Sequence, residues 1–159
     1  MPYLEAGHYF GVEAHQALLD AGFEKELAKV GLQSKVPRAN LLASDCFEFD
    51  HFEQSFEFAI AQSLFTHISM NSIRLCLTRL SQVMPRGGKS FATFFENQAL
   101  EDGEPLVESG SKTVTYSWRD PFHYRRDDLA WLASRLPWHM SYIGDWGHPS
   151  QMMLAFTRL

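Results

Sequence analysis

The sequence predicts an α/β fold in which helices cover a mostly parallel sheet. Apolar runs rich in β-forming residues alternate along the chain with segments whose apolar residues recur at helical spacing, and this alternation is typical of parallel sheets. The last two apolar runs, HMSYIGDW and QMMLAFTRL, are separated only by GHPS, which predicts an antiparallel hairpin at the C-terminal end. Because no repeat or linker interrupts the 159 residues, we expect a single domain over 1–159.

The first third of the chain predicts a strand, a helix and a second strand. Residues 8–14, HYFGVEA, are rich in β-forming residues and end at a carboxylate. The helix that follows would end at Gly31, and its apolar residues at helical spacing are Leu19, Phe23, Leu27 and Val30. Residues 40–45, NLLASD, form a short apolar run that also ends at a carboxylate. An aromatic loop, FEFDHFEQS, comes next.

The middle of the chain repeats this order. Residues 56–65 are apolar over most of their length, as expected for a strand buried on both faces. SMNS then offers cap residues for a helix, whose apolar positions are Ile73, Leu77, Leu80 and Met84. PRGG interrupts that helix, and KSFATFFE at 89–96 alternates like a strand.

A long irregular stretch, residues 97–123, separates these elements from the last helix. A connection of this length inside a compact domain is usually functional or mobile. RRDDLAWLASRLP predicts the helix that follows, because Asp127 and Asp128 suit the positive end of its dipole and Pro137 ends it.

Composition excludes several classes of function. The net charge of −5 gives no general attraction to nucleic acid, which requires clustered Lys and Arg. Cys46 and Cys76 are far apart, and no CxxC pair or Cys/His cluster exists, so no metal site is predicted. No signal peptide or membrane-spanning run is recognisable in the sequence. We therefore expect a cytoplasmic protein that binds neither membranes nor nucleic acid.

Polar side chains follow the predicted strands where a ligand would bind. In open parallel sheets, ligands bind outside the carboxyl ends of the strands. Acidic, polar and thiol side chains stand at those ends: Glu13, Asp45, Cys46, Gln62, Ser63 and Glu96. A carboxylate at a strand end can accept both hydroxyls of a ribose, but Glu13 taken alone also suits a solvated turn.

Five segments, in this order, resemble class I S-adenosylmethionine-dependent methyltransferases. They are YFGVEAHQALLDAG, LLASDCFEF, FEFAIAQSLFTHI, RLSQVMPRGGKSFATFF and YIGDWGHPSQMMLAFTRL. The resemblance covers nearly the whole chain. It implies a Rossmann-like methyltransferase sheet with helices on both faces, a C-terminal antiparallel hairpin and S-adenosylmethionine as the cofactor. It also implies methyl transfer to an acceptor, for which we expect a small molecule.

The resemblance implies a role for each strand-end residue. Glu13 would bind the ribose, Asp45 and Cys46 would contact the adenine ring, and Gln62 and Ser63 would line the pocket near the methionine portion. The stretch 97–123 would form the acceptor side.

His67 would be the titratable group nearest to the acceptor. Two roles stay open for it: a general base, because imidazole exchanges protons near neutral pH, or a structural histidine that braces the next helix.

One part of the family pattern is missing. The family's first strand and glycine-rich loop have no counterpart here, and that strand would lie between residues 8–14 and 56–65. We therefore expect a fold that is incomplete at its N-terminus. The two neighbouring strands could pair directly, or a partner chain, such as a second copy, could supply the strand. The gene product could also begin further upstream, which is the outcome we favour.

Two other functions compete with this one. A nicotinamide-dependent oxidoreductase also holds a ribose with an acidic residue after its second strand, but it needs its own GxGxxG loop. PRGG before a strand and the antiparallel finish favour the methyltransferase. A non-catalytic methyltransferase-like remnant would instead act as a binding or interaction module, through exposed strand edges.

Overall fold

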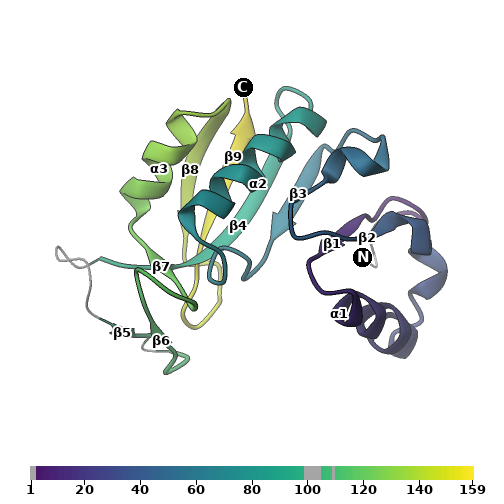
Figure 1. Cartoon of the computed structure of the whole chain (residues 1–159), viewed down its shortest axis with the longest axis horizontal. Coiled ribbons are helices and arrows are strands. Elements are labelled where there is room, and N and C mark those ends of the chain that lie inside the picture. Colours follow the sequence, from purple (N-terminus) through teal and green to yellow (C-terminus); the bar gives the residue numbers. More distant parts are fainter. Residues whose placement is uncertain (1–2, 99–104, 109) are drawn as a thin grey trace. The chain divides into compact units, whose positions relative to one another are not determined.

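The computed structural model describes residues 3–98, 105–108 and 110–159 (Figure 1). Contacts divide the chain into two compact units, Met1–Glu53 and Gln54–Leu159, which we call the N-terminal and the C-terminal unit. Each unit has a sheet of its own. The single domain expected over 1–159 stays a prediction.

The N-terminal unit confirms the predicted order of strand, helix and strand. Strand β1 (Gly11–Glu13) runs parallel to β2 (Leu41–Ala43), with Glu13 opposite Ala43. Between them, α1 (Gln16–Ala21) continues into a π-helical turn over Gly22–Leu27. Single turns of 3₁₀ helix complete the unit over Gln33–Lys35, Arg38–Asn40 and Phe49–Phe52.

A small core and one amide side chain hold this unit together. Val36 and Leu27 are its buried apolar residues. The Asn40 side chain donates hydrogen bonds to the carbonyl oxygens of Gly7 and Tyr9, at 2.8 and 3.1 Å. These bonds tie the segment that enters β1 to the turn that enters β2. The two strands are thereby held in parallel register.

The C-terminal unit contains the larger sheet. Its strand order is β3-β4-β9-β8, and β7 pairs with the end of β4. The first pair is parallel, whereas β4 with β9 and β9 with β8 are antiparallel, so the predicted hairpin is confirmed. The strands are β3 (Phe58–Ala61), β4 (Lys89–Glu96), β7 (His123–Tyr124), β8 (Trp138–Gly144) and β9 (Met152–Arg158).

Helices α2 (Met70–Val83) and α3 (Arg126–Ser134) lie on one face of this sheet (Figure 1). The Trp138 indole on β8 donates a hydrogen bond to the carbonyl oxygen of Leu77 on α2, at 2.9 Å. Apolar side chains between the helices and the strands are almost fully buried: Ile73, Leu77, Leu80, Ala92, Phe94, Leu129, Leu132, Leu154 and Phe156. The helical spacing predicted for α2 is therefore confirmed by its buried face.

The prediction that the strand at 56–65 is buried on both faces is wrong. Phe58 and Ile60 are 70% and 66% exposed. Within the described residues of this unit, β3 is an edge strand that pairs only with β4. Ile60 lies opposite Phe91, whose side chain points to the face away from α2 and α3, since Ala92 belongs to the helix-covered face. An apolar run therefore marks a strand here without marking which of its faces are covered.

The stretch 97–123 contains three very short strands. Strands β5 (Leu106–Val107) and β6 (Val114–Thr115) form a small antiparallel pair, and β7 ends the stretch. Residues 99–104 and 109 of this stretch lie outside the described residues. An isolated parallel bridge between Tyr116 and Phe122 closes the turn before β7.

Candidate functional site

Glu13 ends β1 with a carboxylate at the carboxyl edge of the two-stranded sheet. Its Oε1 accepts a hydrogen bond from the backbone N–H of His15 at 2.9 Å, which fixes the side chain against the strand–helix turn. Among the described residues, none donates a hydrogen bond to Oε2. The side chain is half-buried. The carboxylate is therefore oriented by the chain and retains an oxygen that can accept hydroxyl groups.

Asp45 and Cys46 lie at the same edge, in the loop after β2. The N–H of Ser44 donates to the Glu13 carbonyl oxygen at 3.0 Å, so this loop begins beside the end of β1. The buried Ser44 hydroxyl donates to Glu48 Oε2 at 2.8 Å and accepts from the Cys46 N–H at 3.2 Å. Both Asp45 and Cys46 are exposed. The structure thus brings together the three predicted residues of the N-terminal unit.

Gln62 and Ser63 follow β3 in the C-terminal unit. Gln62 is exposed, whereas Ser63 is half-buried and has a φ of +57°, in the left-handed region. A small network fixes this conformation. The Ser63 N–H donates to Thr93 Oγ1 at 2.7 Å, and the hydroxyls of Ser63 and Thr93 both donate to Gln151 Oε1, at 3.1 and 2.7 Å. The Ser63 oxygen keeps lone pairs that can accept a further hydrogen bond.

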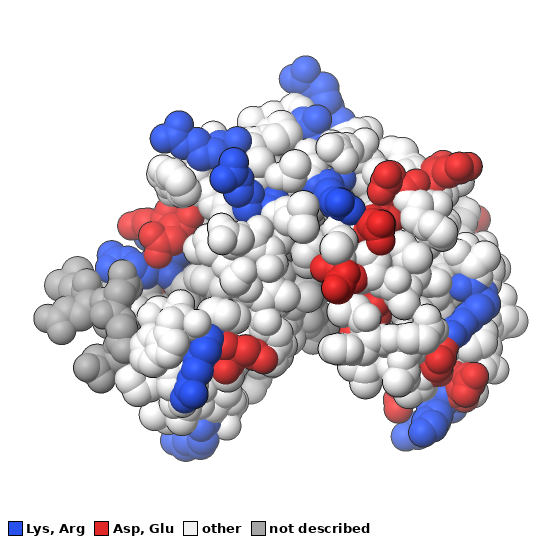
Figure 2. Space-filling view, in the orientation of Figure 1, with Lys and Arg blue, Asp and Glu red and all other residues white. Residues whose placement is uncertain are grey.

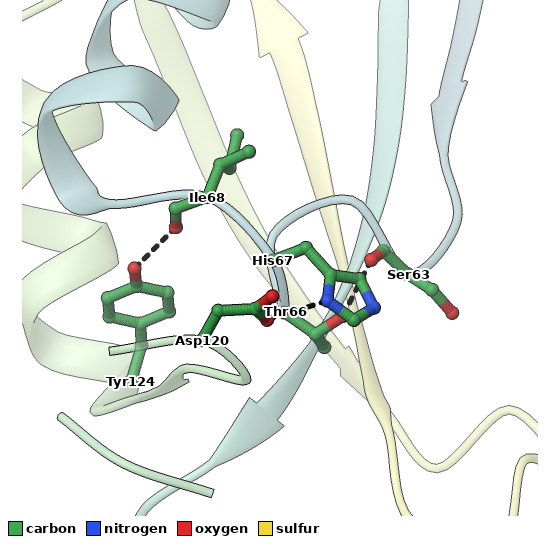
Figure 3. Close-up of polar contacts among 6 residues, drawn as sticks. All are labelled: Ser63, Thr66, His67, Ile68, Asp120 and Tyr124. Atoms are coloured by element: carbon green, nitrogen blue, oxygen red, sulfur yellow. Dashed lines mark hydrogen bonds and ion pairs between the residues drawn. The ribbon is translucent and has the colours of Figure 1, made fainter. Parts of the chain in front are cut away.

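His67 forms a side-chain hydrogen bond with a carboxylate that the sequence does not reveal. Its Nδ1 lies 2.7 Å from Oδ1 of Asp120, 53 residues further along the chain (Figure 3). The two side chains are 60% and 58% exposed. An exposed pair of this kind contributes little to the free energy of folding, but the contact orients the imidazole ring.

Two hydrogen bonds to backbone carbonyl oxygens explain why these two side chains meet. The Phe122 N–H donates to the Thr66 carbonyl oxygen at 2.7 Å. The Tyr124 hydroxyl donates to the Ile68 carbonyl oxygen at 2.6 Å (Figure 3). The segment that carries Asp120 is therefore attached on both sides of the His67 backbone. The Thr66 hydroxyl also donates a hydrogen bond to the Ser63 carbonyl oxygen at 2.6 Å. This bond connects the turn at Ser63 to the residue next to the histidine.

A cavity of about 390 Å³ opens elsewhere in the C-terminal unit. It contains none of the predicted site residues except the strand-end Glu96, and its lining is Glu96, Asn97, Gln98, Arg125, Arg126, Asp127 and Tyr142. The Tyr142 hydroxyl donates to Glu96 Oε2 at 2.6 Å. Desolvation raises the pKa of Tyr142 to about 12, and the hydrogen bond to Glu96 and the charge of Glu96 also raise it. The charge of Arg126 lowers this pKa.

Charge and metal-ligand geometry give no further site. On the face shown in Figure 2, Lys and Arg side chains lie in separate groups rather than in one continuous surface. Within residues 3–98, 105–108 and 110–159, no group of three or more His, Cys, Asp or Glu side chains is arranged to hold a metal ion. In the same ranges, the helices are too short or too polar to cross a bilayer.

Comparison with known proteins places the fold. No protein-family model matches the chain, and no curated protein matches it. Solved structures do match. The glycopeptide N-methyltransferase MtfA, solved with S-adenosyl-L-homocysteine, aligns over 93% of this chain and 72% of its own, with a TM-score of 0.65 and 14% identity. The chain has the class I methyltransferase fold.

Two further structures agree with this fold. An S-adenosylmethionine-dependent methyltransferase from Clostridium acetobutylicum aligns over 92% of this chain and 73% of its own, with a TM-score of 0.64 and 9% identity. An O-methyltransferase family protein from Burkholderia thailandensis aligns over 93% and 42%, with a TM-score of 0.65 and 10% identity. The predicted Rossmann-like α/β sheet with a closing antiparallel hairpin is thus confirmed.

Proposed function

We propose that this chain is an S-adenosylmethionine-dependent methyltransferase with a small-molecule acceptor. The observation that supports it most is Glu13, an oriented carboxylate at the carboxyl edge of a parallel strand pair in a class I methyltransferase fold. The oxygen that His15 leaves unused suits the hydroxyls of a ribose. A hydrogen bond to a charged acceptor contributes about 1.5–3 kcal/mol.

The remaining donors and acceptors fit the other parts of the cofactor. We assign Asp45 and Cys46 to the adenine ring, because their loop is exposed and begins beside Glu13. We assign Gln62 and Ser63 to the methionine portion, since the Ser63 oxygen has lone pairs for an ammonium group. A sulfonium cofactor would supply an electrophilic methyl group. The chain's own residues would bind it and orient the acceptor, which is mainly an effect of positioning.

Cofactor affinity tests this proposal. We expect calorimetry to detect S-adenosylmethionine binding to the wild-type chain, and the Glu13→Ala substitution to weaken it by about tenfold or more, since a charged hydrogen bond is lost. Glu24→Ala is the matched control, because Glu24 is an exposed carboxylate of the same unit. Equal affinity in the Glu13 and Glu24 variants would refute the ribose assignment.

A non-catalytic binding module is the second candidate. The exposed side chains of Phe58 and Ile60 favour it, because an edge strand with apolar residues is suited to pairing with another chain. A second copy or a strand-completing partner would then be the ligand. Absence of binding at millimolar S-adenosylmethionine would favour this function over methyl transfer. A cytoplasmic location stays a prediction.

A further inference from the structure

We propose that Asp120 is a positioning residue. It orients His67, which then takes the proton from the molecule that receives the methyl group. This inference rests on the proposed function and extends it to the class of acceptor. It starts from the 2.7 Å contact between His67 Nδ1 and Asp120 Oδ1 (Figure 3). An ionised carboxylate can only accept hydrogen bonds, so the imidazole nitrogen in this contact is the donor.

The contact selects one tautomer of the histidine. With its proton on Nδ1, the neutral ring carries its lone pair on Nε2, the nitrogen directed away from Asp120 (Figure 3). The His67 side chain is 60% exposed, so a molecule that arrives from solvent can approach the ring.

The surrounding chain keeps the pair in position. The Phe122 N–H donates a hydrogen bond of 2.7 Å to the Thr66 carbonyl oxygen. This hydrogen bond holds the two backbone segments together next to the pair. The Thr66 hydroxyl bond to Ser63 ties the same turn to the residue assigned to the methionine portion. A base held beside the methyl-donating end of the cofactor is placed to act on the acceptor atom.

This arrangement specifies an acceptor that carries a proton at neutral pH, namely a hydroxyl or an amino group. As the acceptor oxygen or nitrogen forms its bond to the methyl group, its proton passes to His67 Nε2 and then to water. The methyl–sulfur bond breaks at the same time, and its electron pair stays on sulfur, so charge is balanced. A carboxylate or a thioether acceptor has no such proton and would not need the pair.

The tautomer of His67 tests the proposal without any acceptor. In nitrogen–proton correlation spectra at a pH where the ring is neutral, we expect Nδ1–H for the wild type. In Asp120→Ala we expect the Nε2–H form that free imidazole side chains favour in water. Asp128→Ala is the control, because Asp128 is an exposed carboxylate of the same unit and should leave the His67 tautomer unchanged. A wild-type ring in the Nε2–H form would overturn the proposal.

Methyl transfer tests the acceptor class. We would follow the labelled methyl of S-adenosylmethionine into pooled alcohols, phenols and amines, and separately into pooled carboxylates and thioethers. We expect label in the first pools only, reduced about 10²-fold in His67→Gln and lowered in Asp120→Ala, with the cofactor affinity unchanged. Label in the second pools, or label in the first pools that neither variant reduces, would contradict the inference. Absence of S-adenosylmethionine binding to the wild-type chain would instead refute the proposed function.

Discussion

Single buried side chains shape the two loops that carry the candidate site. Ser44 is buried and connects Glu48 to the Cys46 backbone, so it holds the loop that presents Asp45. Gln151 is also buried, and its side-chain oxygen accepts two hydroxyls beneath Ser63. Neither residue would contact the cofactor in our assignment. Each orients a residue that we assign to the cofactor.

The two cysteines differ in burial. Cys76 is 4% exposed on α2, and burial raises the pKa of its thiol to about 12, whereas Cys46 is exposed after β2. The thiolate is the nucleophile, so at pH 8 iodoacetamide should modify Cys46 and leave Cys76 intact. Mass spectrometry of the peptides measures this, and both thiols should react in urea. Modification of Cys76 at the rate of Cys46 in the folded protein would contradict the burial.

At the scale of elements, α2 has a defined start. Its N-cap is Ser69, whose Oγ accepts the Ser72 N–H at 3.3 Å, and the sequence SMNS predicts such a cap. The hydroxyl satisfies one of the four backbone donors that a helix leaves open at its N-terminus.

Removing that cap should destabilise the protein by a measurable amount. We expect Ser69→Ala to lower the free energy of unfolding by about 1 kcal/mol in urea titrations followed by circular dichroism. Thr78→Ala is the control on the same helix, because the hydroxyl of the half-buried Thr78 donates to the Arg74 carbonyl oxygen, which is already part of the helix. Equal losses in the two variants would show that the cap has no special role.

Local patterns predicted the helices and the hairpin, because helical spacing and turn residues are features of positions close in sequence. The helical spacing of Ile73 and Leu77 and the short GHPS link before β9 are signals of this kind. The exposure of Ile60 is different, since it depends on which element covers a face of the sheet, and an apolar run does not encode that. Asp120 was missed for the same reason: its contact with His67 spans 53 residues, and nothing distinguishes this carboxylate within 97–123.

At the scale of the whole molecule, the candidate cofactor residues fall into two sets. Glu13, Asp45 and Cys46 belong to the N-terminal unit, and Gln62 and Ser63 belong to the C-terminal unit. Each set follows the end of a strand in its own unit, and the sequence shows these strand ends as apolar runs that stop at polar residues. A cofactor that binds the folded chain would stabilise it by an amount that grows with its affinity, since ligands that bind only the folded state favour it.

Titration of the amide NMR spectrum with S-adenosylhomocysteine tests the central claim most directly. We predict saturable shifts of the His15 amide that contacts Glu13, the Cys46 amide and the Ser63 amide. Amides at the separate cavity near Tyr142 should move little. A spectrum unchanged at millimolar ligand, or shifts confined to that cavity, would contradict the claim that these strand ends bind an adenosyl cofactor.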